Sequence, residues 1–150
     1  MNTLKQGGSV PNFEVFDEQG NVIKLSDYKG KKLVVFFYPK ASTPTCTVEA
    51  CNLRDNYKSL TEAGYSVLGV SADTQKKQSS FKNKYSFPFP LIADVDKVML
   101  HAFGVWGSKK FMGRTFDGIH RKTFLIDEKG IVQRVIDDVK AKNHALQILA

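Results

Sequence analysis

The sequence predicts an α/β fold in which a central mixed β-sheet is flanked by helices. Two almost wholly apolar runs, residues 32–39 and 65–72, have the composition of strands that are buried on both faces of a sheet. Helical patterns alternate with the predicted strands, as they do where right-handed helical crossovers join parallel strands. The length of 150 residues is that of one ordinary domain, so we expect residues 1–150 to form a single domain.

Apolar runs and turn residues predict the first strands. Residues 13–25 (FEVFDEQGNVIKL) predict two short strands around a turn at Gln19-Gly20-Asn21. The run KLVVFFYP at 32–39 predicts a strand that ends at Pro39, and YSVLGVSA at 65–72 predicts the strand that follows it in the sheet.

Between these two strands we expect one helix, at residues 44–63. Thr43 is a preferred N-cap residue type, and Pro44 suits the first helical position because its missing N–H is not needed there. Five apolar positions recur at helical spacing and predict the face turned toward the protein: Cys46, Ala50, Leu53, Tyr57 and Leu60. Cys46 therefore lies just beyond the carboxyl end of a strand, where open α/β sheets form their sites.

The second half of the chain continues the alternation. The polar segment at 74–85 predicts an exposed helix that begins near Thr74. Two prolines predict an extended loop at the start of 87–94, and the apolar end of that segment predicts a short strand. The remaining segments predict a helix at 96–105, a hairpin at 122–137 that turns at Glu128-Lys129-Gly130 and adds an antiparallel edge, and a closing helix at 141–150.

Composition and charge exclude several classes of function. The net charge is +7, from 22 Lys and Arg against 15 Asp and Glu, but the basic residues are scattered and no nucleic-acid-binding motif accompanies them. No stretch approaches the roughly 20 apolar residues that cross a bilayer. The N-terminus has no apolar region of a secretory signal, so we expect a cytoplasmic protein with no nucleic-acid or membrane partner.

The only two cysteines, Cys46 and Cys51, both lie in the predicted helix at 44–63. In a cytoplasmic protein such a pair is more often redox-active or catalytic than structural. Cys46 falls in the first turn, where unpaired backbone N–H groups and the helix dipole favour a thiolate. The competing interpretation is that Cys46 is a small buried hydrophobe.

Helix geometry limits how the two thiols can interact. Five residues give a rotation of about 140° and a rise of about 7.5 Å, which places the two Cα atoms about 8.6 Å apart. A disulfide requires less than about 7 Å. The thiols therefore cannot bond while the helix is intact, but they could bond if its first turns unwound.

Other uses of the cysteines have less support. Zinc binding is disfavoured because the three histidines, His101, His120 and His144, show no metal-ligand spacing. The spacing Cys-x4-Cys differs from the Cys-x-x-Cys of thioredoxin-type exchange. A Cys–His hydrolase with His120 as the base has no local support in the sequence.

The segment PKASTPTC, residues 39–46, fits the pattern Pro-x3-Thr-x2-Cys. This pattern is the active-site signature of the peroxiredoxins, and TPTCTVEACNLRD at 43–55 resembles their bacterioferritin-comigratory-protein (Q) subfamily, in which a second cysteine follows five residues later. Similar segments extend the resemblance over essentially the whole chain. One departure is Thr45, where the subfamily commonly has Gly, but this change removes no chemical group.

The resemblance implies a thioredoxin-like fold and the reduction of hydrogen peroxide and alkyl hydroperoxides. It implies six site residues: Cys46 as the peroxidatic cysteine, Cys51 as the resolving cysteine, Thr43 as a contact of thiolate and peroxide, Arg121 as the cation beside the thiolate, Glu49 as the carboxylate that orients the arginine, and Pro39 as a shield of the pocket. It also implies recycling by thioredoxin or a similar dithiol reductant, no metal or organic cofactor, and a monomer.

Two other functions stay open at this point. A thiol–disulfide oxidoreductase would exchange protein disulfides and consume little peroxide. A redox sensor would signal oxidation through an unwound helix, with negligible turnover. The combination of Thr43, Cys46 and Arg121 favours the peroxidase, because neither alternative needs a pocket that binds peroxide.

Overall fold

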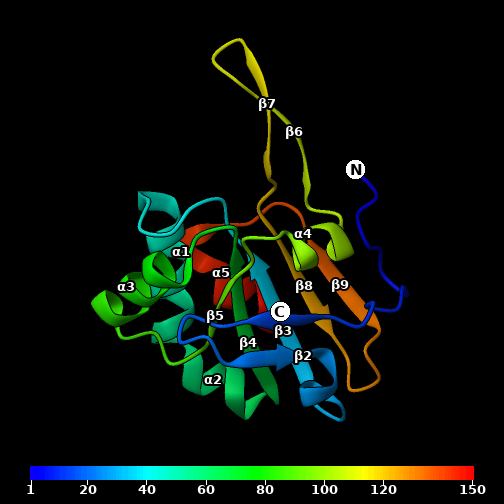
Figure 1. Ribbon diagram of the computed structural model, residues 1–150. Helices are drawn as coiled ribbons and strands as arrows, with labels where there is room; N and C mark the ends of the chain where they lie inside the picture. Colours follow the sequence, from blue (N-terminus) through cyan, green and yellow to red (C-terminus); the bar gives the residue numbers. More distant parts are fainter.

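A five-stranded sheet forms the centre of the computed structural model, which describes all residues 1–150 (Figure 1). Its strands, in spatial order, are β5 (Leu91–Ala93), β4 (Tyr65–Ser71), β3 (Lys32–Phe37), β8 (Lys122–Ile126) and β9 (Val132–Ile136). The strands β3, β4 and β5 run parallel, whereas β8 is antiparallel to both β3 and β9. The predicted mixed sheet with an antiparallel edge is therefore confirmed.

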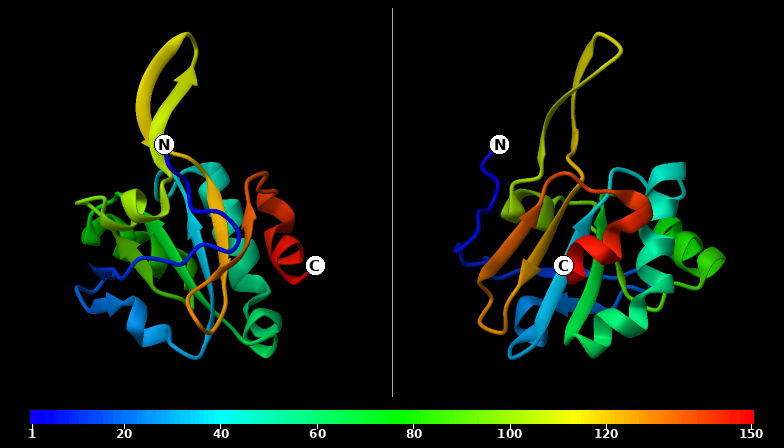
Figure 2. Two further views of the ribbon diagram at one scale, coloured as in Figure 1. Left: turned by 90° about the vertical axis from the view of Figure 1, so that its right-hand side faces the viewer. Right: turned by 180° about the vertical axis from the view of Figure 1, so that it is seen from behind.

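Helices and the N-terminal segment cover the two faces of the sheet. The helices are α1 (Pro44–Asp55), α2 (Tyr57–Glu62), α3 (Gln75–Tyr85), α4 (Val98–Phe103) and α5 (His144–Leu149), with 3₁₀ turns η1 (Leu25–Tyr28) and η2 (Ala141–Asn143). Figure 2 shows α5 and the N-terminal hairpin on opposite sides of the sheet. None of these helices has the length and the apolar character that a membrane crossing requires.

The residues of β3 divide the core into two clusters because side chains alternate along a strand. Leu33, Val35 and Phe37 pack with α4 and the N-terminal segment on one face. The alternate residues Val34 and Phe36 pack on the other face, with side chains from α1, α2, α3 and α5. Both faces are buried, which explains why the sequence of β3 is a continuous apolar run.

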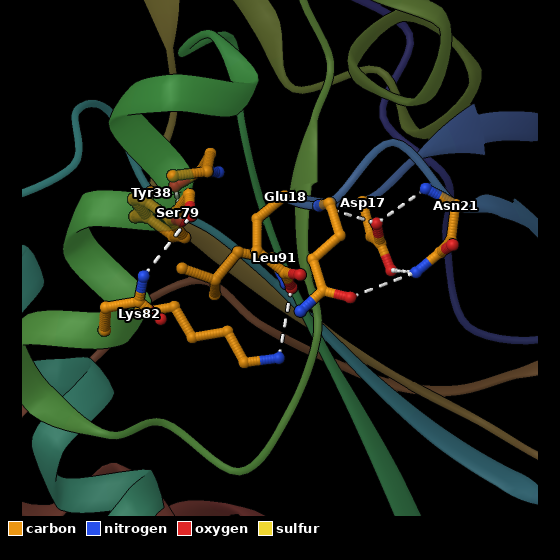
Figure 3. A network of polar contacts seen from close by, with 10 residues as sticks. Asp17, Glu18, Asn21, Tyr38, Ser79, Lys82 and Leu91 are labelled. Carbon is orange, nitrogen blue, oxygen red and sulfur yellow. Dashed lines mark hydrogen bonds and ion pairs between the residues drawn. The ribbon is translucent and has the colours of Figure 1, made fainter.

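A short antiparallel hairpin, β1 (Glu14–Phe16) and β2 (Val22–Lys24), lies near the N-terminus as predicted. Its turn is closed by Asp17, which accepts backbone hydrogen bonds at 2.9 Å from Gln19 and Asn21. Glu18 is buried and accepts hydrogen bonds from Lys82 Nζ at 3.1 Å and from the Leu91 backbone at 3.2 Å (Figure 3). These contacts fasten the hairpin to α3 and β5.

The single helix expected at residues 44–63 is wrong, because the structure has two helices that meet at Asn56. The backbone of Asn56 has left the helical region, with φ −110° and ψ 15°. Its side-chain amide donates to the carbonyl of Asn52 at 2.8 Å. The backbone N–H of Asn56 donates to the same carbonyl at 3.2 Å, so the side chain adds a second bond at the carbonyl where α1 ends.

Residues 106–119, for which the sequence predicts no element, form a long hairpin in the structure. Its strands, β6 (Trp106–Phe111) and β7 (Arg114–Ile119), pair only with each other and project from the body of the protein (Figure 1). The turn residues Met112 and Gly113 both have positive φ, of 52° and 77°. Such turns usually carry Asn or Asp before the glycine. With Met112 at that position, the sequence lacks the residue pair that would predict a hairpin.

The other predicted helices are present with adjusted ends. Thr74 caps α3 by accepting from the Lys77 backbone at 3.3 Å, as predicted. The helix expected at 96–105 begins only at Val98, because the carboxylate of Asp94 caps it by accepting from the backbones of Val98 and Leu100. The closing helix begins as a 3₁₀ turn, η2, before α5.

Candidate active site

Helix α1 begins where the sequence predicts, with Thr43 at the N-cap position and Pro44 as the first helical residue. The hydroxyl of Thr43 does not cap the helix. It donates instead to the carbonyl of Lys40 at 2.7 Å. Because its own proton is committed to that bond, the Thr43 oxygen can serve a further partner only as an acceptor.

The loop before α1 is anchored to the carboxyl end of β4. The backbone N–H of Ala41 donates to Asp73 Oδ2 at 2.7 Å, and the same oxygen accepts from Ser71 Oγ at 2.7 Å. Ser42, next in the loop, has a φ of 64°, a left-handed conformation that is strained for a residue with a side chain. The anchor thus holds a strained turn immediately before the first cysteine.

Cys46 is buried in the first turn of α1 with only 1% of its surface exposed. Arg121 Nη2 donates to its Sγ at 3.2 Å. The antiparallel pairing of β3 with β8 places Phe37 opposite Lys122, which brings Arg121 beside the start of α1. The sheet register therefore explains how residues 75 positions apart meet.

The carboxylate of Glu49 holds Arg121 from the other side. Arg121 Nη1 donates to Glu49 Oε1 at 2.5 Å, and the Glu49 side chain is fully buried. Burial raises the pKa of Glu49 to about 7, although Arg121 opposes this by favouring the ionised form. Burial works to lower the pKa of Arg121, but Glu49 and Cys46 outweigh it and raise that pKa, so the guanidinium is a permanent cation.

Cys51 lies on the same helix and is half-buried. Neither it nor Cys46 is in a disulfide. Burial raises the pKa of Cys51, against the opposing effect of Arg54. Cys51 is therefore held as a neutral thiol in this folded state.

A groove of about 400 Å³ lies between the loop at Pro39 and the base of the β6–β7 hairpin. Its lining includes Pro39, Lys40, Asp73, Trp106, Lys109 and Phe116. Burial, and after it the charge of Arg121, lower the pKa of Lys109, which donates to the carbonyl of Ile119 at 2.8 Å. Lys109 on the groove wall is thus influenced by the charge of Arg121, whereas Cys46, Thr43 and Arg121 do not line the groove.

The structure thus brings Cys46, Glu49 and Arg121 into one contact set and places Thr43 in the turn before Cys46. The exposed side chain of Thr45 lies at the surface of the helix start. No group of three or more His, Cys, Asp or Glu side chains lies close enough together to hold a metal ion.

One residue of this neighbourhood was missed by sequence reasoning. His144, fully buried at the start of α5, has its Nε2 3.5 Å from Glu49 Oε2. From the sequence, His144 was weighed only as a candidate metal ligand. No local pattern links it to Glu49, because the contact depends on how α5 packs against α1.

Comparisons with known proteins identify the family of the chain. The sequence matches the AhpC/TSA family over residues 7–135. It is 49% identical over 144 residues to peroxiredoxin Bcp of Escherichia coli strain K12, an alignment that covers 96% of this chain and 92% of the relative. The chain therefore belongs to the AhpC/TSA family, and the resemblance to the Bcp or Q type of peroxiredoxin is confirmed.

Solved structures show the same fold. Peroxiredoxin Q of Xanthomonas campestris superimposes with a TM-score of 0.87 at 33% identity, covering 98% of this chain and 92% of the other. A cysteine mutant of PrxQ from Xylella fastidiosa gives a TM-score of 0.92 at 31% identity, covering 99% and 95%. The expected thioredoxin-like fold is therefore confirmed.

Proposed function

We propose that the protein is a thiol-dependent peroxidase that reduces hydrogen peroxide and organic hydroperoxides at Cys46. The observation that carries this proposal is the contact of Arg121 Nη2 with the buried Cys46 Sγ at 3.2 Å, with the guanidinium fixed by Glu49. The Xanthomonas campestris relative is described by its alkyl peroxide reduction activity, and the E. coli relative is named a peroxiredoxin.

The first step is attack of the Cys46 thiolate on the terminal oxygen of the hydroperoxide. A sulfur–oxygen bond forms, the oxygen–oxygen bond breaks, and the leaving alkoxide or hydroxide takes a proton to become an alcohol or water. Arg121 stabilises the negative charge that grows on the oxygens. The Thr43 oxygen accepts the peroxide O–H, and Pro39 limits water access from the groove. The product is sulfenic acid at Cys46.

The second step joins the two cysteines. Cys51 sulfur attacks the sulfenic sulfur, a disulfide forms, and the hydroxyl leaves as water. The step needs the first turns of α1 to unwind, because a helix holds the two Cα atoms about 8.6 Å apart. Thioredoxin or a similar dithiol reductant then supplies two electrons and restores both thiols. This chemistry needs no metal or organic cofactor, and we propose that a cytoplasmic monomer performs it.

The test measures how fast the reduced protein consumes peroxide and compares this rate with that of the Cys46→Ser variant. We expect the parent to consume one equivalent far faster than a free thiol, and the mass spectrum then to show a Cys46–Cys51 disulfide. Cys46→Ser should show neither. Rapid exchange with protein disulfides and peroxide consumption no faster than a free thiol would instead favour the oxidoreductase.

A further inference from the structure

Glu49 Oε2 is the only buried side-chain nitrogen or oxygen atom of the protein that lacks a hydrogen-bond partner. The other oxygen of this carboxylate is bound by Arg121. An unpaired carboxylate oxygen in the interior is unfavourable, so its surroundings call for a physical explanation. His144 Nε2 lies 3.5 Å from this oxygen without a hydrogen bond between them.

The protonation of His144 is defined by its neighbour Gln147. The Oε1 of Gln147 accepts from the Lys140 backbone at 2.9 Å, and its Nε2 donates to the Asp138 carbonyl at 2.8 Å, which fixes the orientation of the amide. That oxygen lies 2.8 Å from His144 Nδ1, so Nδ1 carries a hydrogen. Nε2 is therefore the ring atom at which a proton is gained or lost.

The groups around Nε2 come from three elements. On β8, the Thr123 hydroxyl lies 2.7 Å from Nε2, and Arg121 precedes the strand. On α1 are Glu49 and, beyond Arg121, Cys46. On α5 itself, Gln147 occupies the opposite ring nitrogen.

The charges of this buried set do not balance when Cys46 is ionised. The buried members, a thiolate, a guanidinium and a carboxylate, sum to one negative charge. Lys109 is a further cation that acts on Cys46 and Arg121, but it lines the solvent-open groove, where its charge is screened. One further proton makes the set neutral, which lowers the cost of burial. Burial raises the pKa of Glu49 to about 7 and lowers the pKa of His144, so both groups favour their uncharged forms.

We propose that Glu49 Oε2 and His144 Nε2 share one proton that stays on the pair while Cys46 is a thiolate, which makes His144 a positioning residue for the reactive cysteine. With the proton on Oε2, the Thr123 hydroxyl donates to Nε2; with the proton on Nε2, that ring atom donates to Thr123 Oγ1. In both arrangements Oε1 stays directed at Arg121 Nη1. The Nη2 group of Arg121 then stays directed at Cys46. The inference rests on the proposed role of Cys46.

The first test replaces the histidine by a side chain of similar polarity that cannot hold the proton. In His144→Gln, we expect the Cys46 thiolate to form at a pH about 0.5 units higher, which slows the oxidation step about threefold below that midpoint. Thiolate absorbance and the pH profile of the oxidation rate report both effects. His101→Gln, at an exposed histidine, is the control. An unchanged pH profile in folded His144→Gln would overturn the proposal.

A double-mutant cycle separates this effect from a loss of packing. In a Glu49→Gln background, the partner carboxylate is absent, so His144→Gln should not shift the pH profile further. An equal shift in both backgrounds would show that His144 acts without Glu49, contrary to the proposal.

A third measurement leaves His144 in place. The ¹⁵N shifts of His144 and the carboxyl ¹³C shift of Glu49 are followed against pH in the reduced parent and in Cys46→Ser. Loss of the thiolate should let the pair release its proton at lower pH, and identical titrations would refute the shared proton. Peroxide consumption by Cys46→Ser tests the proposed function separately.

Discussion

The side chain of Asn52 accepts a hydrogen bond from the backbone N–H of Ala145 at 2.8 Å and so ties helix α1 to helix α5. The amide of the same side chain donates to the carbonyl of Lys142 at 2.8 Å. Asn52 immediately follows Cys51. If α1 unwinds from its start at Cys46, the hydrogen bonds of Asn52 to α5 and η2 therefore oppose unwinding beyond Cys51.

Loosening this tie should make disulfide formation easier. In Asn52→Ala we expect Cys46 and Cys51 to join faster after oxidation, because α1 opens at a lower free energy. Loss of the two bonds should lower the free energy of unfolding by about 1–3 kcal/mol. Quenched-flow mass spectrometry measures the rate, and denaturant unfolding measures stability.

The control for this variant is Asn83→Ala, at an exposed position of α3. It should change neither the rate of disulfide formation nor the stability. A normal rate in Asn52→Ala would show that opening of α1 does not limit the second step.

Arg121 should matter through its geometry as well as its charge. Arg121→Lys keeps a cation but cannot bind Glu49 and Cys46 at once through two nitrogens of a planar group. We expect the oxidation step to slow by roughly 10²–10³-fold, as for loss of one transition-state donor. Stopped-flow measurement of the first turnover tests this beside Arg114→Lys at the exposed hairpin. Equal rates in the two variants would contradict the role of Arg121.

Cys51→Ser should separate the two chemical steps. The variant retains Cys46, Arg121 and Glu49, so it should undergo one oxidation at the parental rate. It cannot form the intramolecular disulfide, and thioredoxin-coupled turnover should be lost. A single-turnover trace measures the rate of the oxidation step, and a steady-state assay measures thioredoxin-coupled turnover. Normal steady-state turnover would rule out resolution by Cys51.

Glu49 and His144 should impose opposite pH dependences on stability. Glu49 has its pKa raised from 4.5 to about 7, so the folded protein binds this proton more tightly, and stability falls as pH rises across that range. His144 has its pKa lowered from 6.5, so stability falls instead as pH drops below that value.

Single variants separate the two slopes. Relative to Glu49→Gln, the parent should lose stability as pH rises from 4.5 to 7. Relative to His144→Gln, the parent should gain stability as pH rises toward 6.5. Denaturant unfolding at several pH values measures these differences. Parallel curves for all three proteins would contradict both pKa shifts.

The local parts of the site could be predicted from the sequence. The placement of Cys46 in the first turn of α1 follows from Thr43, Pro44 and the preceding apolar strand, and the structure has this arrangement. The contact of Arg121 with Cys46 required the resemblance, because it depends on the register of β8 against β3. The roles assigned to these residues stay predictions.

The contacts made by α5 could not be predicted. Asn52 and His144 are ordinary polar residues in the sequence, and their partners lie about 90 positions away or more in tertiary contact. The break at Asn56 could not be predicted because the apolar stripe continues across it, while the backbone of Asn56 leaves the helical region. The β6–β7 hairpin was missed because Met112 occupies a turn position that usually signals itself by asparagine.

The isolation of the β6–β7 hairpin makes its tip a practical place for engineering. A backbone bond from His120 to Val105, at 2.8 Å, closes the base of the hairpin. The tip at Met112, 88% exposed, is far along the strands from that closure. An affinity tag or fluorescent reporter inserted between Met112 and Gly113 should leave the central sheet folded. Strand β7 ends two residues before Arg121, so the inserted group is connected to the site through one strand.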